Sequence, residues 1–328
     1  MVAFLLACAG EDGAAPELVW PDWSAPATVI GALDTPAEEV FGRIADVAVG
    51  PEQNIHVLDD QASEVRVFTP GGAHVASFGG PGEGPRELQR PVSLTVDGTG
   101  RSLVGLADRR VKAFSISEPD APPAMVELSV LGRTLCVVGE RIVAQGSTPE
   151  DTTVVWVHDL QGNLQASYGA GPPAPNAMIG YAMRQGRAAC VPPDLTVYKV
   201  GNDSTLTAYT LDGQRLWSAV IPAWLGTIVE ATENGYSVRA PEDGFTVLES
   251  LVPLSARALL AQVSFRTTAS REAGERWEEL RSYLIDPRDG SVQPLAEALP
   301  HLVGASLDWL IGLEVDPFPR LLVWERPR

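Results

Sequence analysis

The stretch from Arg43 to Pro91 reads RIADVAVGPEQNIHVLDDQASEVRVFTPGGAHVASFGGPGEGPRELQRP. It contains four short apolar-rich runs, which are Ile44–Val49, Asn54–Leu58, Glu64–Phe68 and His74–Phe78. Turn-forming residues separate these runs, and short turns join antiparallel neighbours. The stretch therefore predicts one four-stranded antiparallel sheet, followed by a Gly-rich passage that leads into the next sheet.

The same pattern recurs along the chain. Further four-run units cover residues 92–130, 134–168, 187–220 and 250–295, and the last hairpins of the five units turn near residues 72, 119, 162, 213 and 290. Most of these intervals are 43 to 51 residues, and an insertion at Arg266–Glu279 lengthens the last one. A period of this size without amphipathic helices is typical of four-stranded propeller blades.

Two pairs of runs remain at the ends of the chain. Glu17–Trp20 and Ala27–Leu33 precede the first unit, and Asp308–Val315 and Arg320–Glu325 follow the fifth. Neither pair makes a blade alone, and a closed ring leaves no exposed sheet edge. We therefore predict an all-β, six-bladed propeller over residues 17–328, whose last blade combines two N-terminal with two C-terminal strands.

Composition limits the classes of partner. The chain has 328 residues, 45% of them hydrophobic, and a formal net charge of −18. An acidic field repels phosphate backbones and anionic headgroups, so nucleic-acid binding is disfavoured. A cationic ligand is more compatible with this field, although solubility alone accounts for the acidity.

Three cysteines lie far apart in the sequence. Cys136 and Cys190 are in apolar runs, which favours free, small core residues, and at most one disulfide can form. Cys8 follows the apolar segment Val2–Ala7, and Leu5-Leu6-Ala7-Cys8 is similar to a bacterial lipobox. Only seven residues precede Cys8 and none is Lys or Arg, so either a longer signal peptide is truncated here or the similarity is accidental. We favour the first interpretation, with residues 1–16 as signal and flexible tether and Cys8 as the lipid attachment site.

The first unit also resembles a known family. The segments RIADVAVGPEQNIHVLD and FGGPGEGPRELQRP resemble NHL repeats, in particular those of bacterial six-bladed propeller lipoproteins. The resemblance is close from Ile44 to Val96, fair through Phe114 and architectural beyond. It implies a propeller fold and an extracytoplasmic location, with a lipid anchor that holds the protein on the periplasmic side of a bacterial membrane. The resemblance transfers no catalytic residue.

The predicted topology sorts the loops by face. The second-to-third-strand loops and the inter-blade loops lie on one face, and this face carries the long connections, where binding residues concentrate on rigid scaffolds. We expect a ligand or partner to meet this face near the central channel. The candidate residues are Asp59, Asp60, Arg86, Arg90, Asp108, Arg109, Asp151 and Asp203.

These side chains allow two kinds of chemistry. The acidic loop residues are a possible calcium site, because calcium takes oxygen ligands from several loops, but the chain has no D-x-D-x-D-G loop and we predict no cofactor. Arg86 and Arg90 flank Glu87 and could bind a carboxylate or phosphate. An Arg–Glu clamp that fixes the inter-blade loop is the simpler explanation.

We therefore expect a monomeric, non-catalytic, extracytoplasmic binding or interaction scaffold for a protein, peptide or small molecule. The alternative is an enzyme on the same ring, such as a metal-dependent lactonase or an NHL-type lyase. Three or four carboxylates with Asn side chains converging on the channel would favour the enzyme, and an apolar channel with a polar rim would favour the binding protein.

Overall fold

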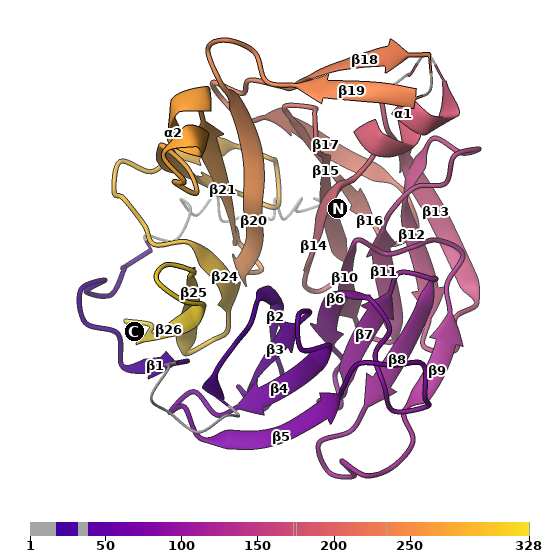
Figure 1. Cartoon of the computed structure of the whole chain (residues 1–328), viewed down its shortest axis with the longest axis vertical. Coiled ribbons are helices and arrows are strands. Elements are labelled where there is room, and N and C mark those ends of the chain that lie inside the picture. The colour runs from indigo at the N-terminus through magenta and orange to yellow at the C-terminus, as the bar shows by residue number, and fades with distance from the viewer. Residues whose placement is uncertain (1–17, 32–38, 173, 175, 234, 328) are drawn as a thin grey trace, which may run out of the picture.

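The computed structural model describes residues 18–31, 39–172, 174, 176–233 and 235–327. Six four-stranded antiparallel sheets are arranged as the blades of a ring (Figure 1). The predicted fold class, an all-β six-bladed propeller, is confirmed. The predicted lipid attachment residue Cys8 lies outside the described residues.

The first five blades follow the predicted order along the chain. Their strands are β2 (Ile44–Val49), β3 (Ile55–Asp59), β4 (Glu64–Phe68) and β5 (His74–Gly79); β6 (Pro91–Val96), β7 (Ser102–Leu106), β8 (Arg110–Phe114) and β9 (Ala124–Glu127); β10 (Thr134–Val138), β11 (Arg141–Gln145), β12 (Thr153–Asp159) and β13 (Leu164–Ala170); β14 (Gly186–Val191), β15 (Leu195–Val200), β16 (Thr205–Thr210) and β17 (Arg215–Val220); β20 (Phe245–Ser255), β21 (Ala258–Arg266), β22 (Glu279–Ile285) and β23 (Val292–Pro294). The first strand of each blade lies innermost in the ring (Figure 1).

The sixth blade combines N- and C-terminal strands, as predicted, but in a different proportion. It consists of β24 (Leu302–Ala305), β25 (Trp309–Glu314), β26 (Arg320–Glu325) and β1 (Thr28–Ile30), so three C-terminal strands and one N-terminal strand form it. The prediction missed β24 because Gly304 interrupts its apolar run and the pairing with β25 shifts register there. Trp20 belongs to no strand, and Trp23 instead packs edge-on against Trp324, with 5.2 Å between ring centroids.

The hydrophobic core lies between the blades. The second strands β3, β7 and β15 are buried at every residue, because a neighbouring blade covers each of their faces. One cluster joins Val65 and Phe78 of the first blade to Val104 and Phe114 of the second, and the two phenyl rings stack with centroids 5.4 Å apart. Apolar layers between blades therefore hold the ring together.

Polar side chains also tie each of the first five blades to the next. At each junction one side chain bonds to the backbone of the following blade, and the pairs are Asp46 with Leu94 N, Ser93 with Gly132 O, Gln145 with Gly186 N, Arg187 with Leu248 O, and Gln262 with Leu302 N. Asp46, Ser93 and Arg187 are on inner strands, whereas Gln145 and Gln262 are on second strands. These bonds fix how neighbouring blades lie beside one another.

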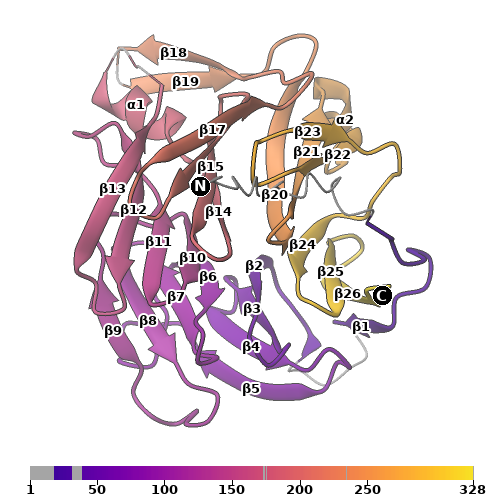
Figure 2. The ribbon, with the colours of Figure 1, turned by 180° about the vertical axis from the view of Figure 1, so that it is seen from behind.

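The insertions carry the additional elements. Helix α1 (Ala177–Met183) lies between the third and fourth blades, beside the hairpin of β18 (Ile228–Thr232) and β19 (Gly235–Arg239) (Figure 2). Helix α2 (Thr268–Glu272) occupies the predicted expansion between the second and third strands of the fifth blade. In the described part of the chain, no helix is long and apolar enough to cross a membrane.

A disulfide joins Cys136 on β10 to Cys190 on β14, with the two Cα atoms 5.8 Å apart. The expectation of two free core thiols is therefore wrong. The apolar context was read correctly, but consecutive inner strands place residues 54 positions apart in the sequence side by side. The bond links the third and fourth blades covalently at the channel wall.

Candidate ligand site in the central channel

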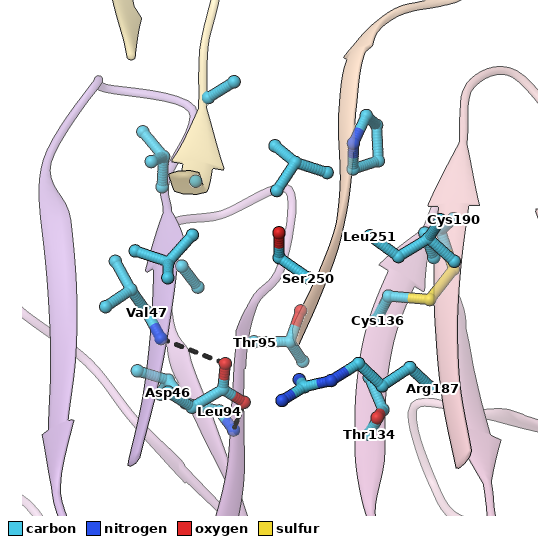
Figure 3. A pocket seen from close by; sticks show the side chains of 18 of the residues that line it. Asp46, Val47, Leu94, Thr95, Thr134, Cys136, Arg187, Cys190, Ser250 and Leu251 are labelled. Carbon is cyan, nitrogen blue, oxygen red and sulfur yellow. Dashed lines mark hydrogen bonds between the residues drawn. A yellow bond between two sulfur atoms is a disulfide. The ribbon is translucent and has the colours of Figure 1, made fainter. Parts of the chain in front are cut away.

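The six inner strands enclose a cavity of about 500 Å³ (Figure 3). This volume lies within the range of small-molecule binding sites. Side chains from all six blades line it, and Arg276, from the connection between α2 and β22, is its main contribution from outside the inner strands. The cavity therefore combines a rigid wall with one residue supplied by an insertion.

The two ends of the cavity differ in polarity. Asp46, Arg187, Glu249, Arg276 and His301 are its ionisable lining residues outside the disulfide, and together we call them the charged end. Asp46 and Arg187 belong to the first half of their strands, and His301 directly precedes β24. Later positions of the inner strands contribute mainly apolar side chains, such as Val49, Val96 and Ala305.

The charged end lies toward the face of the ring that carries the long connections. Arg276 follows α2 in the second-to-third-strand connection of the fifth blade and lines the cavity. The first halves of all inner strands point to the same face, because each of these strands begins its blade. Loops and the polar end of the channel thus share one face of the ring.

Asp46 is a structural residue as well as a cavity residue. Its carboxylate accepts hydrogen bonds from the backbone N–H groups of Leu94 (2.8 Å) and Val47 (3.0 Å). Burial raises the pKa of Asp46 to about 6, although these two bonds and the Arg187 charge act in the opposite direction. Asp46 is therefore the group at the charged end whose charge changes near neutral pH.

Arg187 is held by one of its nitrogens and free at the other two. Its Nε donates to the Leu248 carbonyl oxygen at 3.2 Å, and its side chain remains exposed to the cavity. Figure 3 shows its guanidinium group pointing from β14 toward the Asp46 side of the cavity. Neither terminal amino group forms a hydrogen bond or ion pair within 4.0 Å with any residue that the structure describes.

Two arginines balance the negative charge of Glu249, on β20. It forms an ion pair with Arg266, accepts a hydrogen bond from the Ser264 hydroxyl at 2.5 Å, and lies 3.7 Å from an Arg276 amino group. Burial acts to raise the pKa of Glu249, but these contacts outweigh it and hold the pKa below its usual value. Arg276 also packs over the Trp277 ring, 4.4 Å from the centroid. Glu249 therefore stays ionised and positions two arginines.

His301 is buried without a partner for its ring nitrogens. His301 is 6% exposed. Neither of its ring nitrogens forms a hydrogen bond of normal geometry with the described residues, although the Glu249 backbone lies beside the ring. Trp277 packs edge-on against it at 5.5 Å. Burial, helped by the Arg276 and Arg187 charges, lowers the pKa of His301 to about 3, so the imidazole is neutral at physiological pH.

The predicted acidic loop residues are occupied by their own loops. Asp59 is fully buried and accepts hydrogen bonds from the backbone N–H groups of residues 42, 43, 61 and 62. Asp60 forms an ion pair with Arg43. Asp151 and Asp203 each accept from the backbone N–H two residues further along. These four carboxylates stabilise turns, and the structure does not bring them together.

The predicted arginines and Asp108 are similarly engaged. Arg86 pairs with Asp120 rather than with Glu87, so the expected Arg–Glu clamp is wrong. Arg109 forms an ion pair with Glu127, and Asp108 with Arg110. Arg90 is exposed and has a positive φ of 53°.

All eight predicted residues lie in the described part of the chain, and none of them lines the channel cavity. Binding at these loops stays a prediction.

Two further features contribute little to a site. Among the described residues, no group of three or more His, Cys, Asp or Glu side chains is arranged to hold a metal ion.

A second cavity of about 350 Å³ lies between the fourth and fifth blades beside Lys199. The Lys199 ammonium donates hydrogen bonds to the carbonyls of Val200 and Gly201 and lies 3.4 Å from the centroid of the Trp224 ring. Its charge and two of its three N–H donors are therefore already engaged by the protein.

Sequence reasoning missed the charged end because each member looks isolated in the sequence. The detectable signal was a charged residue inside an apolar innermost strand, as in Arg187 of GRAACV and Glu249 of TVLESLV. The channel brings these single residues together from several blades.

Comparison with known proteins supports the fold. No family model matches the chain, and no curated protein is similar to it in sequence. The chain is similar in structure to a "putative exported protein" from Bacteroides fragilis, with 12% identity, a TM-score of 0.56, and coverage of 92% of this chain and 97% of that one. It is also similar to the WD40 repeats of RRP9, with 14% identity, a TM-score of 0.51, and coverage of 87% and 80%. At these identities the similarity shows the propeller fold alone.

Proposed function

We propose that this protein is a non-catalytic, extracytoplasmic binding protein that receives a small molecule at the charged end of its central channel. The observation that carries the proposal is the cavity of about 500 Å³. In it, the terminal amino groups of Arg187 and the ring nitrogens of His301, which have no hydrogen-bond partner among the described residues, meet an apolar wall. Apolar walls with a few convergent polar groups are typical of ligand sites.

The extracytoplasmic location is supported by two observations. The Cys136–Cys190 disulfide is a feature that oxidising compartments maintain. The similar Bacteroides fragilis structure is named a "putative exported protein". The resemblance of the first blade to NHL repeats and of Cys8 to a lipidation site fits the same proposal, with the lipid anchor as the contact to the membrane.

The composition of the cavity favours binding over the alternative, an NHL-type lyase or metal-dependent lactonase. That enzyme would need several carboxylates and Asn side chains converging on the channel. Among the described residues, the wall holds the carboxylates of Asp46 and Glu249 and no Asn side chain. Both carboxylates are already engaged by backbone N–H groups or arginines.

The test is a thermal-shift screen with a channel-blocking variant. Ala45 lines the cavity and is exposed to it, so Ala45→Trp should fill the charged end. Val75→Trp, at an exposed position on β5, is the matched control. Neutral sugars, amines, dipeptides and carboxylates are screened against the full chain.

We expect at least one compound to stabilise wild type and Val75→Trp but not Ala45→Trp. The proposal fails if every stabilising compound acts equally on Ala45→Trp. Metal analysis with a chelator in the same melt addresses the enzyme alternative, because a bound metal whose removal lowers the melting temperature would favour it.

A further inference from the structure

We propose that the channel binds the carboxylate of a small monoanionic ligand, with Arg187 holding the carboxylate and His301 donating a further hydrogen bond to it. This inference rests on the proposed function and specifies the chemical class of its ligand. Three features of the described residues carry it: the free donors of Arg187, the unpartnered His301 and the balance of charge.

The orientation of Arg187 suits a carboxylate. Its Nε bond to the Leu248 carbonyl fixes the guanidinium plane against β20. The two terminal amino groups then face the cavity with parallel N–H bonds, which match the two oxygens of a planar carboxylate. The protein has thus already fixed the orientation of the group that would bind, which lowers the entropic cost of binding.

His301 supplies an independent observation. A side chain that is more than nine-tenths buried normally has its polar atoms paired, because an unpaired buried polar atom costs free energy. Neither ring nitrogen of His301 forms a hydrogen bond of normal geometry with the described residues, the adjacent Glu249 backbone included, and the residue lines the same cavity as Arg187. A neutral imidazole can donate one hydrogen bond, so a ligand oxygen would satisfy it.

The charges around the cavity favour a monoanion. Arg187 and Arg276 line the cavity, and Arg266, which does not line it, is paired with the lining Glu249. These three positive charges against the two negative charges of Asp46 and Glu249 leave a net charge of +1. A carboxylate balances this charge. A doubly charged phosphate would exceed it in a protein whose formal net charge is already −18.

The apolar wall indicates the rest of the ligand. Val49, Val96, Leu251 and Val303 line the cavity beyond the charged end. A ligand with a carboxylate at one end and a compact apolar body at the other would place both parts in matching surroundings. Benzoate has this form and serves as the probe.

The experiment is isothermal titration of the full chain with benzoate, with benzamide as its neutral analogue and inorganic phosphate as the alternative anion. Arg187→Gln removes the positive charge, and Arg187→Lys keeps the charge without the planar pair of donors. His301→Phe keeps a ring for Trp277 to pack against. Arg141→Gln is the matched control, because Arg141 does not line the cavity. Arg141, on β11, forms an exposed ion pair with Asp212, in the turn between β16 and β17.

We expect Arg187→Gln to bind benzoate at least about tenfold more weakly than wild type, and Arg187→Lys and His301→Phe to bind it a few-fold more weakly. Arg141→Gln should bind as wild type does, and benzamide at least about tenfold more weakly than benzoate. The benzamide comparison needs no variant, so it decides the question even if a substitution disturbs folding.

Several results would overturn the inference: no binding of benzoate to wild type, equal binding of benzoate and benzamide, tighter binding of phosphate, or equal effects of Arg187→Gln and Arg141→Gln. If benzoate fails while a neutral compound gives a shift that Ala45→Trp abolishes, the carboxylate is wrong and the proposed function stands. If no compound of any class gives such a shift, the proposed function itself fails.

Discussion

Removing the disulfide between Cys136 and Cys190 should destabilise the ring by a calculable amount. The bond closes a loop of 54 residues, for which the chain-entropy relation gives about 4 kcal/mol at 25 °C. Unfolding entropy scales with length, so for this chain the loss corresponds to a fall in melting temperature of about 6 °C. The Cys136→Ala/Cys190→Ala double variant should show this fall.

The assay combines a thermal melt with thiol counting on protein purified under oxidising conditions. Wild type, unfolded without reductant, should show one reactive thiol if Cys8 is unmodified and none if Cys8 carries its lipid, and reductant should lower its melting temperature to that of the double variant. Cys8→Ala is the control and should keep the wild-type melting temperature. Three reactive thiols in unreduced wild type, or a double variant that melts within about 1 °C of wild type, would refute the reasoning.

Three further predictions concern protonation and backbone geometry. Benzoate affinity should increase as the pH falls from 7.5 to 5.5, because Asp46, whose pKa burial raises to about 6, loses its negative charge over this range, whereas Glu249 stays ionised and His301 stays neutral. Titration at both pH values checks this, and an Asp46→Asn variant should lose the dependence. The free energy of unfolding should decrease as the pH falls from about 6.5 toward 4, by about 2 kcal/mol for each of His56 and His301. The folded-state pKa values of these residues, about 4 and about 3, lie below the unfolded value, so the unfolded state binds protons first. The raised pKa of Asp46 opposes part of this loss, and denaturant titrations at pH 7 and pH 4.5 measure the sum. Gly79→Ala should destabilise the fold by about 2 kcal/mol or more, because φ is +102° and an added Cβ would lie 2.8 Å from a backbone oxygen, whereas Gly98→Ala, with open space around it, should melt as wild type does.

The ring itself could be predicted from the sequence because its signal is local and repeated. Turns such as Thr69–Gly72 and Leu211–Gly213 recur at nearly even spacing, and each needs only its own hairpin to form. The closure of the sixth blade was less certain, because β24 is four residues long and contains Gly304. A short strand interrupted by glycine gives almost no periodic signal.

The candidate site could not be predicted because it depends on contacts between distant segments. Arg187 and His301 are 114 positions apart in the sequence, and the cavity that unites them exists only when the ring is closed. The loop carboxylates, in contrast, were conspicuous in the sequence, yet the carboxylate oxygens of residues such as Asp59 accept hydrogen bonds from nearby backbone N–H groups. The disulfide was missed for the same reason as the site.

The most direct test of the central claim is a crystal of the full chain soaked with 4-bromobenzoate, whose bromine is located by anomalous scattering. The account predicts one strong bromine peak inside the channel cavity, with the carboxylate on the terminal amino groups of Arg187 and the bromine toward Val49 and Val303. A channel without a bromine peak under saturating conditions, or peaks confined to the outer surface of the blades, would contradict it.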